Sequence, residues 1–181
     1  PEVEKAKLPP FALSFYKFIF FKGRLPQETE LWNYYLNQHF AAIDETHLRL
    51  EKNGKTYGVA SVKARLLRSY PSLIRDFHFY VLCQTSDQFE HVSYSLRQDY
   101  YAGIDLCVQY AGHKFQVSVM LNSPRARAYK TKKYARRAEV PQNEVIMLFE
   151  LHQYVQIRGQ IKLFTMRHIE LLVGELKKRI G

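Results

Sequence analysis

Two repeating patterns of apolar residues divide the chain into predicted helices and strands. An aromatic run over Phe11–Lys22 predicts a short helix that ends at Gly23. A second helix is predicted to begin at Pro26, and apolar residues recur along it at helical spacing: Leu31, Trp32, Tyr35, Leu36 and Phe40. We expect these segments to form an N-terminal helical hairpin whose aromatic stripe belongs to the core rather than to a base-stacking platform.

A turn signal follows this hairpin. The dipeptide Asn53-Gly54 lies between the apolar runs Leu48–Lys52 and Thr56–Val59, which predicts a small β-hairpin. Residues 1–59 are therefore expected to make up one domain, a helical hairpin together with a β-hairpin. Residues 60–181 are expected to make up the second domain.

The second predicted domain begins with a long helix over Ser61–Gln84, broken or kinked at Pro71. Its expected buried face carries Leu73, Ile74, Phe77, Tyr80 and Val81. Arg75, Asp76 and His78 interrupt this apolar run. Two interpretations of them stay open, a structural Arg–Asp pair that holds the helix to a sheet and a group in an active site.

Alternating apolar residues then predict a series of strands. Phe89–Leu96 is the first, and residues 97–102 link it to a hairpin in which Ile104–Tyr110 and Phe115–Leu121 flank a short turn. Glu144–Leu151 is a further strand, and Gln160–Phe164 is expected to extend the sheet. An amphipathic helix over Arg167–Ile180 closes the chain, with a buried face of Ile169, Leu172, Val173, Leu176 and Ile180. The predicted class is α/β of the α+β kind, a mixed central sheet flanked by helices.

The distribution of charge adds most to this picture in the region between the predicted hairpin and the strand Glu144–Leu151. Eight Lys or Arg residues lie between Asp105 and Glu139, and no acid lies among them. Ser123-Pro124 is typical of a helix start. On a helix, a small-residue face of Ala128, Thr131 and Ala135 could dock on the sheet. The candidate DNA-binding residues are Arg125, Arg127, Tyr129, Lys130, Lys132, Lys133, Arg136 and Arg137.

The whole composition supports a polyanionic partner for this basic segment. The 181 residues are 46% hydrophobic and 14% aromatic, which indicates a folded protein, and the net charge is +10. Cations that neutralise phosphates release counterions, so DNA is the expected partner. A solvated basic face and a mobile arm that orders on DNA are the alternatives.

Other features narrow the expected class of protein. No Gly-rich phosphate loop, HExxH motif or CxxC pair occurs, so nucleotide hydrolysis and zinc catalysis have no support. Cys83 and Cys107 lie in apolar runs and are expected to be buried thiols, which favours the cytoplasm. The run Phe11–Phe21 is too short to span a bilayer, so no membrane partner is expected. The first residue is Pro1 rather than Met, and we expect the chain to be part of a longer protein.

The order of elements, with Asp105 opening the second strand and Gln116 in the third, resembles the core of the PD-(D/E)XK nuclease-like superfamily. The resemblance covers Ser72 to Glu150. In that family an acid on the second strand and a Glu-x-Lys on the third hold a divalent metal and activate water. The resemblance implies that Asp105 is the first acid and a metal ligand, while Gln116 and Ser118 stand where the family has Glu and Lys. Ile104 stands where the family usually has Pro.

These differences bear on catalysis. Gln116 can offer a neutral oxygen but no charge, and Ser118 cannot stabilise charge as Lys does. Lys130, Lys132 or Lys133 could replace the missing lysine, and Asp99 or Asp76 could supply the missing acid. Mg²⁺ is the implied cofactor if the site is catalytic. Asp105 also has a purely structural interpretation as a strand-start residue beside Gly103.

Three functional hypotheses follow. The first is a DNA-binding domain with a nuclease-like core that contacts the phosphate backbone and acts in DNA recombination, transposition, restriction or repair. The second is a Mg²⁺-dependent endonuclease that uses Asp105 and Gln116. The third is a protein-interaction module whose aromatic N-terminal hairpin docks on other subunits of a larger DNA-processing machine.

Overall fold

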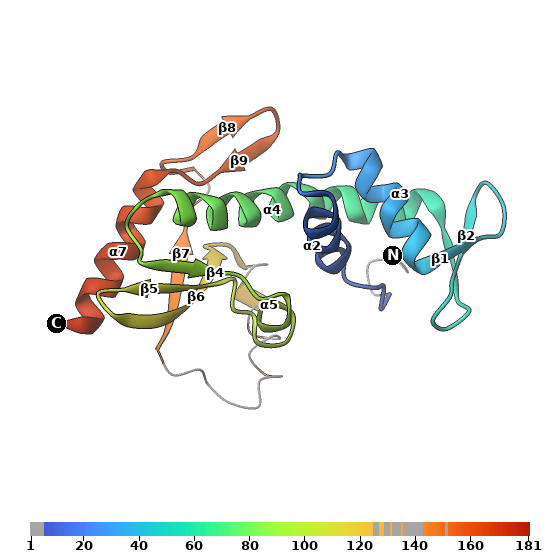
Figure 1. Cartoon of the computed structure of the whole chain (residues 1–181). Helices are drawn as coiled ribbons and strands as arrows, with labels where there is room; N and C mark the ends of the chain where they lie inside the picture. Colours follow the sequence, from blue (N-terminus) through green and yellow to red (C-terminus); the bar gives the residue numbers. More distant parts are fainter. Residues whose placement is uncertain (1–5, 125–126, 129–130, 132–134, 136–142, 151) are drawn as a thin grey trace. The chain divides into compact units, whose positions relative to one another are not determined.

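The structure is a computed structural model that describes residues 6–124, 127–128, 131, 135, 143–150 and 152–181 (Figure 1). It combines helices with mixed sheets and is of the predicted α+β class. Two compact units are present, Pro1–Ile74 and Arg75–Gly181. The boundary between them falls inside one helix, α4, which spans Val59–Thr85.

The first unit contains the predicted helical hairpin, α2 (Phe11–Lys22) and α3 (Glu28–His39). Gly23 ends α2 in a left-handed conformation, with φ of 67°, and its N–H donates to the Ile19 carbonyl at 2.7 Å. The Gln27 N–H, at the start of α3, donates to the Glu30 carboxylate at 2.9 Å. Local capping therefore fixes both ends of the turn between the helices.

The aromatic stripe of α3 is core, as predicted. Tyr35 is fully buried, and its ring lies 4.8 Å from the ring of Phe11 and 5.7 Å from that of Phe40. The Tyr35 hydroxyl donates to the Pro9 carbonyl at 3.0 Å, so its polar end is satisfied. The other buried hydrophobic residues of the two helices are Phe15, Tyr16, Phe18, Ile19, Leu31 and Trp32.

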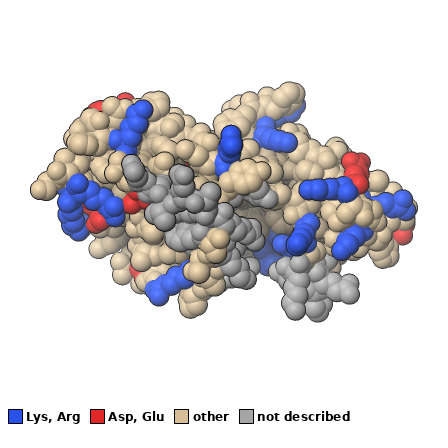
Figure 2. All heavy atoms as spheres, turned by 90° about the horizontal axis from the view of Figure 1, so that it is seen from below, with Lys and Arg blue, Asp and Glu red and all other residues tan. Residues whose placement is uncertain are grey.

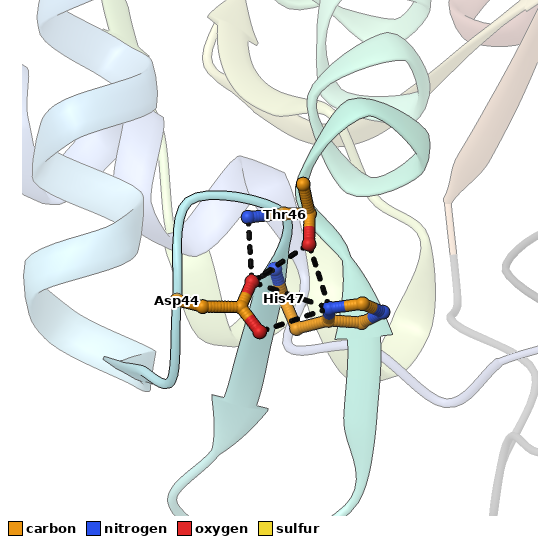
Figure 3. A network of polar contacts seen from close by, with 3 residues as sticks. All are labelled: Asp44, Thr46 and His47. Atoms are coloured by element: carbon orange, nitrogen blue, oxygen red, sulfur yellow. Dashed lines mark hydrogen bonds and ion pairs between the residues drawn. The ribbon is translucent and has the colours of Figure 1, made fainter.

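A small antiparallel sheet completes the unit, in the order β1-β2-β3: β1 (Phe40–Ala42), β2 (His47–Leu50) and β3 (Thr56–Gly58). The predicted hairpin between β2 and β3 is confirmed, whereas β1 was not predicted. In the loop before β2, the Asp44 carboxylate accepts hydrogen bonds from the Thr46 hydroxyl at 2.7 Å, the Thr46 N–H at 2.7 Å and the His47 N–H at 2.8 Å (Figure 3). These bonds, the Thr46 hydroxyl first, lower the pKa of Asp44 to about 2.

Helix α4 runs through Pro71, where the sequence predicted a break or kink. In the second unit its buried residues include Phe79 and Cys83, four positions apart. The predicted face is therefore partly wrong: Tyr80 packs against the core as predicted, but Phe77 is only half-buried, and Phe79 and Cys83 were not predicted. This stretch is apolar nearly all round, so periodicity alone could not select the face that meets the sheet.

The main sheet has the order β4-β5-β6-β7: β4 (His91–Ser93), β5 (Leu106–Tyr110), β6 (His113–Leu121) and β7 (Glu144–Phe149). The first three strands are antiparallel, and β7 is parallel to β6. One face of the sheet shares a core with α4 and α7 through residues that include Phe79, Cys83, Leu106, Val117, Val145 and Leu172.

Helix α5 (Leu96–Ala102) lies between β4 and β5, where the sequence predicted the end of a strand and a link. The Ser95 hydroxyl accepts the Gln98 N–H at 3.3 Å and caps its start. Gly103 ends it with φ of 69°. The helix was missed because seven residues are too few to display a helical period.

Two further elements follow the sheet. The strands β8 (Gln156–Arg158) and β9 (Ile161–Leu163) pair only with each other, so the prediction that this region extends the main sheet is wrong. Helix α7 (Met166–Ile180) buries Ile169, Leu172, Val173 and Leu176 as predicted, but Ile180 is exposed. In the part of the chain that is described, no helix is both long and apolar enough to cross a membrane.

His168, at the start of α7, makes stability depend on pH. It is 1% exposed, its ring lies 4.8 Å from the rings of both Phe149 and Phe164, and its Nδ1 accepts the Thr165 N–H at 3.1 Å. Burial lowers its pKa in the folded state. Between that value and about 6.5 the unfolded chain binds a proton that the folded chain does not, so the free energy of unfolding should fall as pH drops through this window.

The test is urea denaturation of the wild type and His168→Gln between pH 7.5 and pH 5. Gln is a standard residue at this capping position, so the variant keeps an acceptor for the Thr165 N–H but cannot titrate. We expect a shallower dependence on pH in the variant. Burial lowers the pKa of His39 and of His78 as well, so part of the dependence should remain. Equal slopes in both proteins would contradict the role given to His168.

Candidate functional site

The face of the main sheet opposite the core carries polar side chains in register. Ser93, Cys107, Gln116 and Glu144 occupy one row across the four strands, as successive Cα partners. The residues that alternate with them, such as Leu106 and Val117, point into the core because successive side chains of a strand alternate between faces. The candidate site residue Gln116 therefore lies in the middle of a polar row.

Asp105 immediately precedes β5 and is bonded to β6 by its backbone and its side chain. Its N–H donates to the Val117 carbonyl at 2.9 Å, and its carboxylate accepts the Val119 N–H at 2.6 Å. Strand β5 begins at Leu106, one residue after Asp105. The Val119 N–H of β6 therefore donates to the Asp105 carboxylate and not to a backbone carbonyl of β5. This bond supports the structural interpretation of Asp105 and occupies one of its two carboxylate oxygens.

Ser118 stands where the nuclease-like family has a lysine, and it is fully buried. Its hydroxyl lies 2.9 Å from the Gly103 carbonyl and 2.8 Å from Oε1 of Glu144. It can donate to one of these oxygens at a time. This position thus joins β6 to Glu144 on β7 and contributes no positive charge.

Glu144 is an acid that the sequence analysis did not single out. It is the Cα partner of Gln116 across the parallel β6–β7 pair, and its carboxylate contacts Ser118. The alternative acids lie on helices: the Asp99 carboxylate on α5 accepts the Tyr94 hydroxyl at 3.0 Å, and Asp76 on α4 lies 3.9 Å from Arg75. Asp105 and Glu144 are oxygen donors of the kind that Mg²⁺ prefers. The described residues include no group of three or more His, Cys, Asp or Glu that could hold a metal.

Arg75, one of the three polar residues that interrupt the apolar run of α4, packs against an aromatic ring. Arg75 is 8% exposed, and its guanidinium carbon lies 5.9 Å from the ring centroid of Phe164. The distance from its Nε to the Asp76 carboxylate, 3.9 Å, is too long for a hydrogen bond. The contact with Phe164 favours a structural role for Arg75, whereas the predicted structural role rested on its pairing with Asp76.

The bond from Val119 to Asp105 leads to a prediction. Asp105→Ala should lower the free energy of unfolding by about 1–3 kcal/mol, because it leaves the Val119 N–H without its acceptor. Asp105→Asn keeps an acceptor oxygen of the same geometry and should lose less than about 1 kcal/mol. Chemical denaturation of the two variants measures both values, and equal losses would show that the bond does not contribute to stability.

The basic segment is described at a few positions only. Arg127 is exposed, its N–H donates to the Ser123 carbonyl at 3.0 Å, and its guanidinium contacts the side chain of Asn122. The Ala135 N–H donates to the Thr131 carbonyl at 3.0 Å. Both bonds join residues four apart, as in a helix. The other candidate DNA-binding residues lie outside the described residues: Arg125, Tyr129, Lys130, Lys132, Lys133, Arg136 and Arg137.

One expectation for this segment is wrong. Ala128, Thr131 and Ala135 are exposed, so they do not dock on the sheet. Small side chains bury little apolar area, and this gives only a weak driving force for such packing.

Lys and Arg side chains are also scattered over the face of the molecule seen in Figure 2. Arg75–Gly181 contains sixteen Lys or Arg and ten Asp or Glu. Three cations lie in the last turn of α7, Lys177, Lys178 and Arg179, and two of them are paired: Lys178 and Arg179 lie 3.5 and 3.4 Å from the Glu175 carboxylate. Arg167 lies 2.6 Å from Glu170. These residues are therefore weaker candidates for phosphate contact than residues 125–137, which include no acid.

From α4 onward the described elements come in the order α4, β4, α5, β5, β6, β7, β8, β9 and α7, so α5 and the pair β8–β9 are additional to the elements that the resemblance named. Comparisons of the chain with protein-family models, with curated proteins and with solved structures gave no match.

Proposed function

We propose that this chain is a DNA-binding domain that contacts the phosphate backbone through residues 125–137. The observation that carries the proposal is that residues 125–137, in the connection between the parallel strands β6 and β7, include seven Lys or Arg and no acid. Lys and Arg in such a run repel one another, and a polyanion relieves that repulsion while it releases its own counterions. The exposed Arg127 guanidinium supports the proposal.

The resemblance of the sequence to the nuclease-like core supports a role in recombination, transposition, restriction or repair of DNA, which are the settings that the resemblance implies. The cytoplasm is the proposed compartment, and the free thiols of Cys83 and Cys107 are in keeping with it. Cys83 is buried as predicted, while Cys107 is only half-buried.

A second candidate function is a Mg²⁺-dependent endonuclease. The observation that favours it is the position of Glu144, which is the Cα partner of Gln116. Glu144 would supply the acid that the nuclease-like family has at the position of Gln116. Asp105 and Glu144 would hold the metal, which would activate water for attack on a phosphodiester. Asp105 would keep its bond to Val119, and Ser118 would orient Glu144.

A third candidate is a protein-interaction module. Phe20 and Phe21, at the end of α2, are 65% and 76% exposed, and the Lys22 ammonium lies 5.1 Å from the ring centroid of Phe21. Exposed neighbouring aromatic residues are typical of surfaces that bind another protein. The helical hairpin would then dock on another subunit of a DNA-processing machine.

The first test is the affinity for a labelled 20-base-pair DNA duplex, measured by fluorescence anisotropy from 50 to 300 mM salt. Contact with several phosphates should give a steep linear fall of log K with log salt, on the order of −0.9 per phosphate. No binding at the lowest salt, or binding that does not respond to salt, would overturn the DNA-binding proposal and favour the third candidate.

The second test separates binding from cleavage. The same DNA is incubated with Mg²⁺ or Mn²⁺ and with wild type, Asp105→Asn or Glu144→Gln. The first variant keeps the acceptor for Val119, so loss of cleavage in a folded variant would point to metal chemistry rather than to misfolding. Cleavage by the wild type that both variants abolish would establish the endonuclease, and intact DNA in all three samples supports a domain that binds without cutting.

A further inference from the structure

A pocket of about 410 Å³ opens on the polar face of the main sheet, beside α5. Residues of β4, β5 and β6 line it, together with Gln98 of α5 and Asn143, which precedes β7. Its polar lining includes four side-chain amides, one imidazole and one ammonium group: Gln98, Gln109, Gln116, Asn143, His91 and Lys114. Among the residues that the structure describes, those that line the pocket include no Asp or Glu.

The register explains why these groups converge. Gln109 is the Cα partner of His91 on one side and of Lys114 on the other, so the three form a row across β4, β5 and β6. Gln116 belongs to the next row of the same face. The sheet itself therefore holds the side-chain amides of Gln109 and Gln116, the two central amides, in place. Rigid strands position such groups better than loops do.

The central amides are available to a ligand. Gln98 uses its oxygen to accept the Cys107 thiol at 3.4 Å, and the Asn143 amide donates to the Lys114 carbonyl at 3.4 Å. Within the described part of the chain, the side-chain amides of Gln109 and Gln116 have no hydrogen-bond partner. Both residues are half-buried, so a ligand that bonds them would also be partly removed from water.

The chemistry of the lining selects a ligand class. A side-chain amide presents a donor and an acceptor side by side, which matches the adjacent N6 and N7 groups of adenine. The exposed His91 imidazole offers a flat ring for stacking, and Lys114 at the rim suits a phosphate. A base can enter such a pocket only when it has left the stack of a duplex.

We propose that this pocket binds one unstacked nucleobase, with adenine preferred, and that Gln109 and Gln116 bond its edge. The inference rests on the proposed DNA-binding function and deepens it. Phosphate contacts of the basic segment supply general affinity, and the pocket makes binding depend on whether a base is free to leave the helix. The protein would then favour DNA with a bulge, a mismatch or a single-stranded junction.

The experiment compares three labelled duplexes at one salt concentration: fully paired, with one bulged adenosine, and with an abasic residue at the bulge. The two bulged duplexes carry the same number of phosphates, so only the base differs. We expect wild-type protein to bind the bulged adenosine about tenfold more tightly than the abasic bulge. Gln109→Leu and Gln116→Leu should each reduce that ratio, and the double variant should bring it below about twofold.

Three controls keep the outcomes distinct. Gln88→Leu, an exposed amide outside the pocket, should keep the wild-type ratio. Thermal melting checks that each variant folds. If Gln109→Leu does not fold, Gln109→Glu replaces it, because Glu keeps the size of the side chain but loses the hydrogen-bond donor. Equal affinity of the wild type for both bulges would overturn the base pocket but not phosphate binding. An unchanged ratio in the folded double variant would also overturn it, and no binding to any duplex would overturn both proposals.

Discussion

Replacing Phe79 by alanine should lower the free energy of unfolding of the C-terminal unit by about 3–5 kcal/mol. The side chain is 1% exposed, and its ring lies 5.7 Å from that of Phe149 and 5.2 Å from that of Phe164. Removing the ring deletes contacts with the sheet and with the segment before α7, and leaves a cavity that close-packed neighbours only partly fill.

Phe77 is the matched control for this prediction. It lies two residues away on the same helix and is half-buried, so Phe77→Ala should lose roughly 1–2 kcal/mol. Urea denaturation followed by circular dichroism measures both variants. If Phe77→Ala proved the more destabilising of the two, the face of α4 that the structure places against the sheet would be wrong.

The second large effect concerns DNA affinity. Changing Lys130, Lys132, Lys133 and Arg136 together to Gln should weaken binding to a DNA duplex on the order of 100-fold or more at 0.1 M salt. The slope of log K against log salt should become shallower by about 3 to 4, because each lost phosphate contact removes about 0.9. Anisotropy titrations at several salt concentrations measure both quantities.

The control for this variant removes the same charge elsewhere. Arg49, Lys52, Lys55 and Lys63 are exposed residues of the N-terminal unit, and their change to Gln lowers the net charge equally. We expect this control to bind within about threefold of the wild type, since exposed charges that make no contact with phosphates are screened by salt. Equal losses in both variants would mean that overall charge, rather than the segment between β6 and β7, drives binding.

Much of the fold could be predicted because local signals were strong. Gly23 and Asn53-Gly54 set turns through their backbone preferences, and the apolar stripe of α7 has a clear helical period. The errors have physical causes. Strand β1 has three residues and depends on its partner β2 for its conformation, so no local pattern could reveal it.

The candidate site was less predictable, because its contacts join residues far apart in the sequence. Asp105 was found from its position at the start of a strand, but its bond to Val119 depends on where β5 begins relative to β6. Glu144 became relevant only through the parallel pairing of β6 and β7, which places it beside Gln116. The amide pocket likewise requires the register of three strands, and single residues such as Gln109 carry no signal of it.

The boundary between the two units inside α4 has a practical consequence for dissecting the molecule. A fragment that started at Arg75 would begin in mid-helix, with fraying backbone amides just ahead of Phe79. A fragment that starts at Val59 instead retains the whole of helix α4, including its N-terminal turn. A fragment made to study the second unit should therefore include the sixteen residues from Val59 to Ile74, which belong to α4 but are assigned to the first unit.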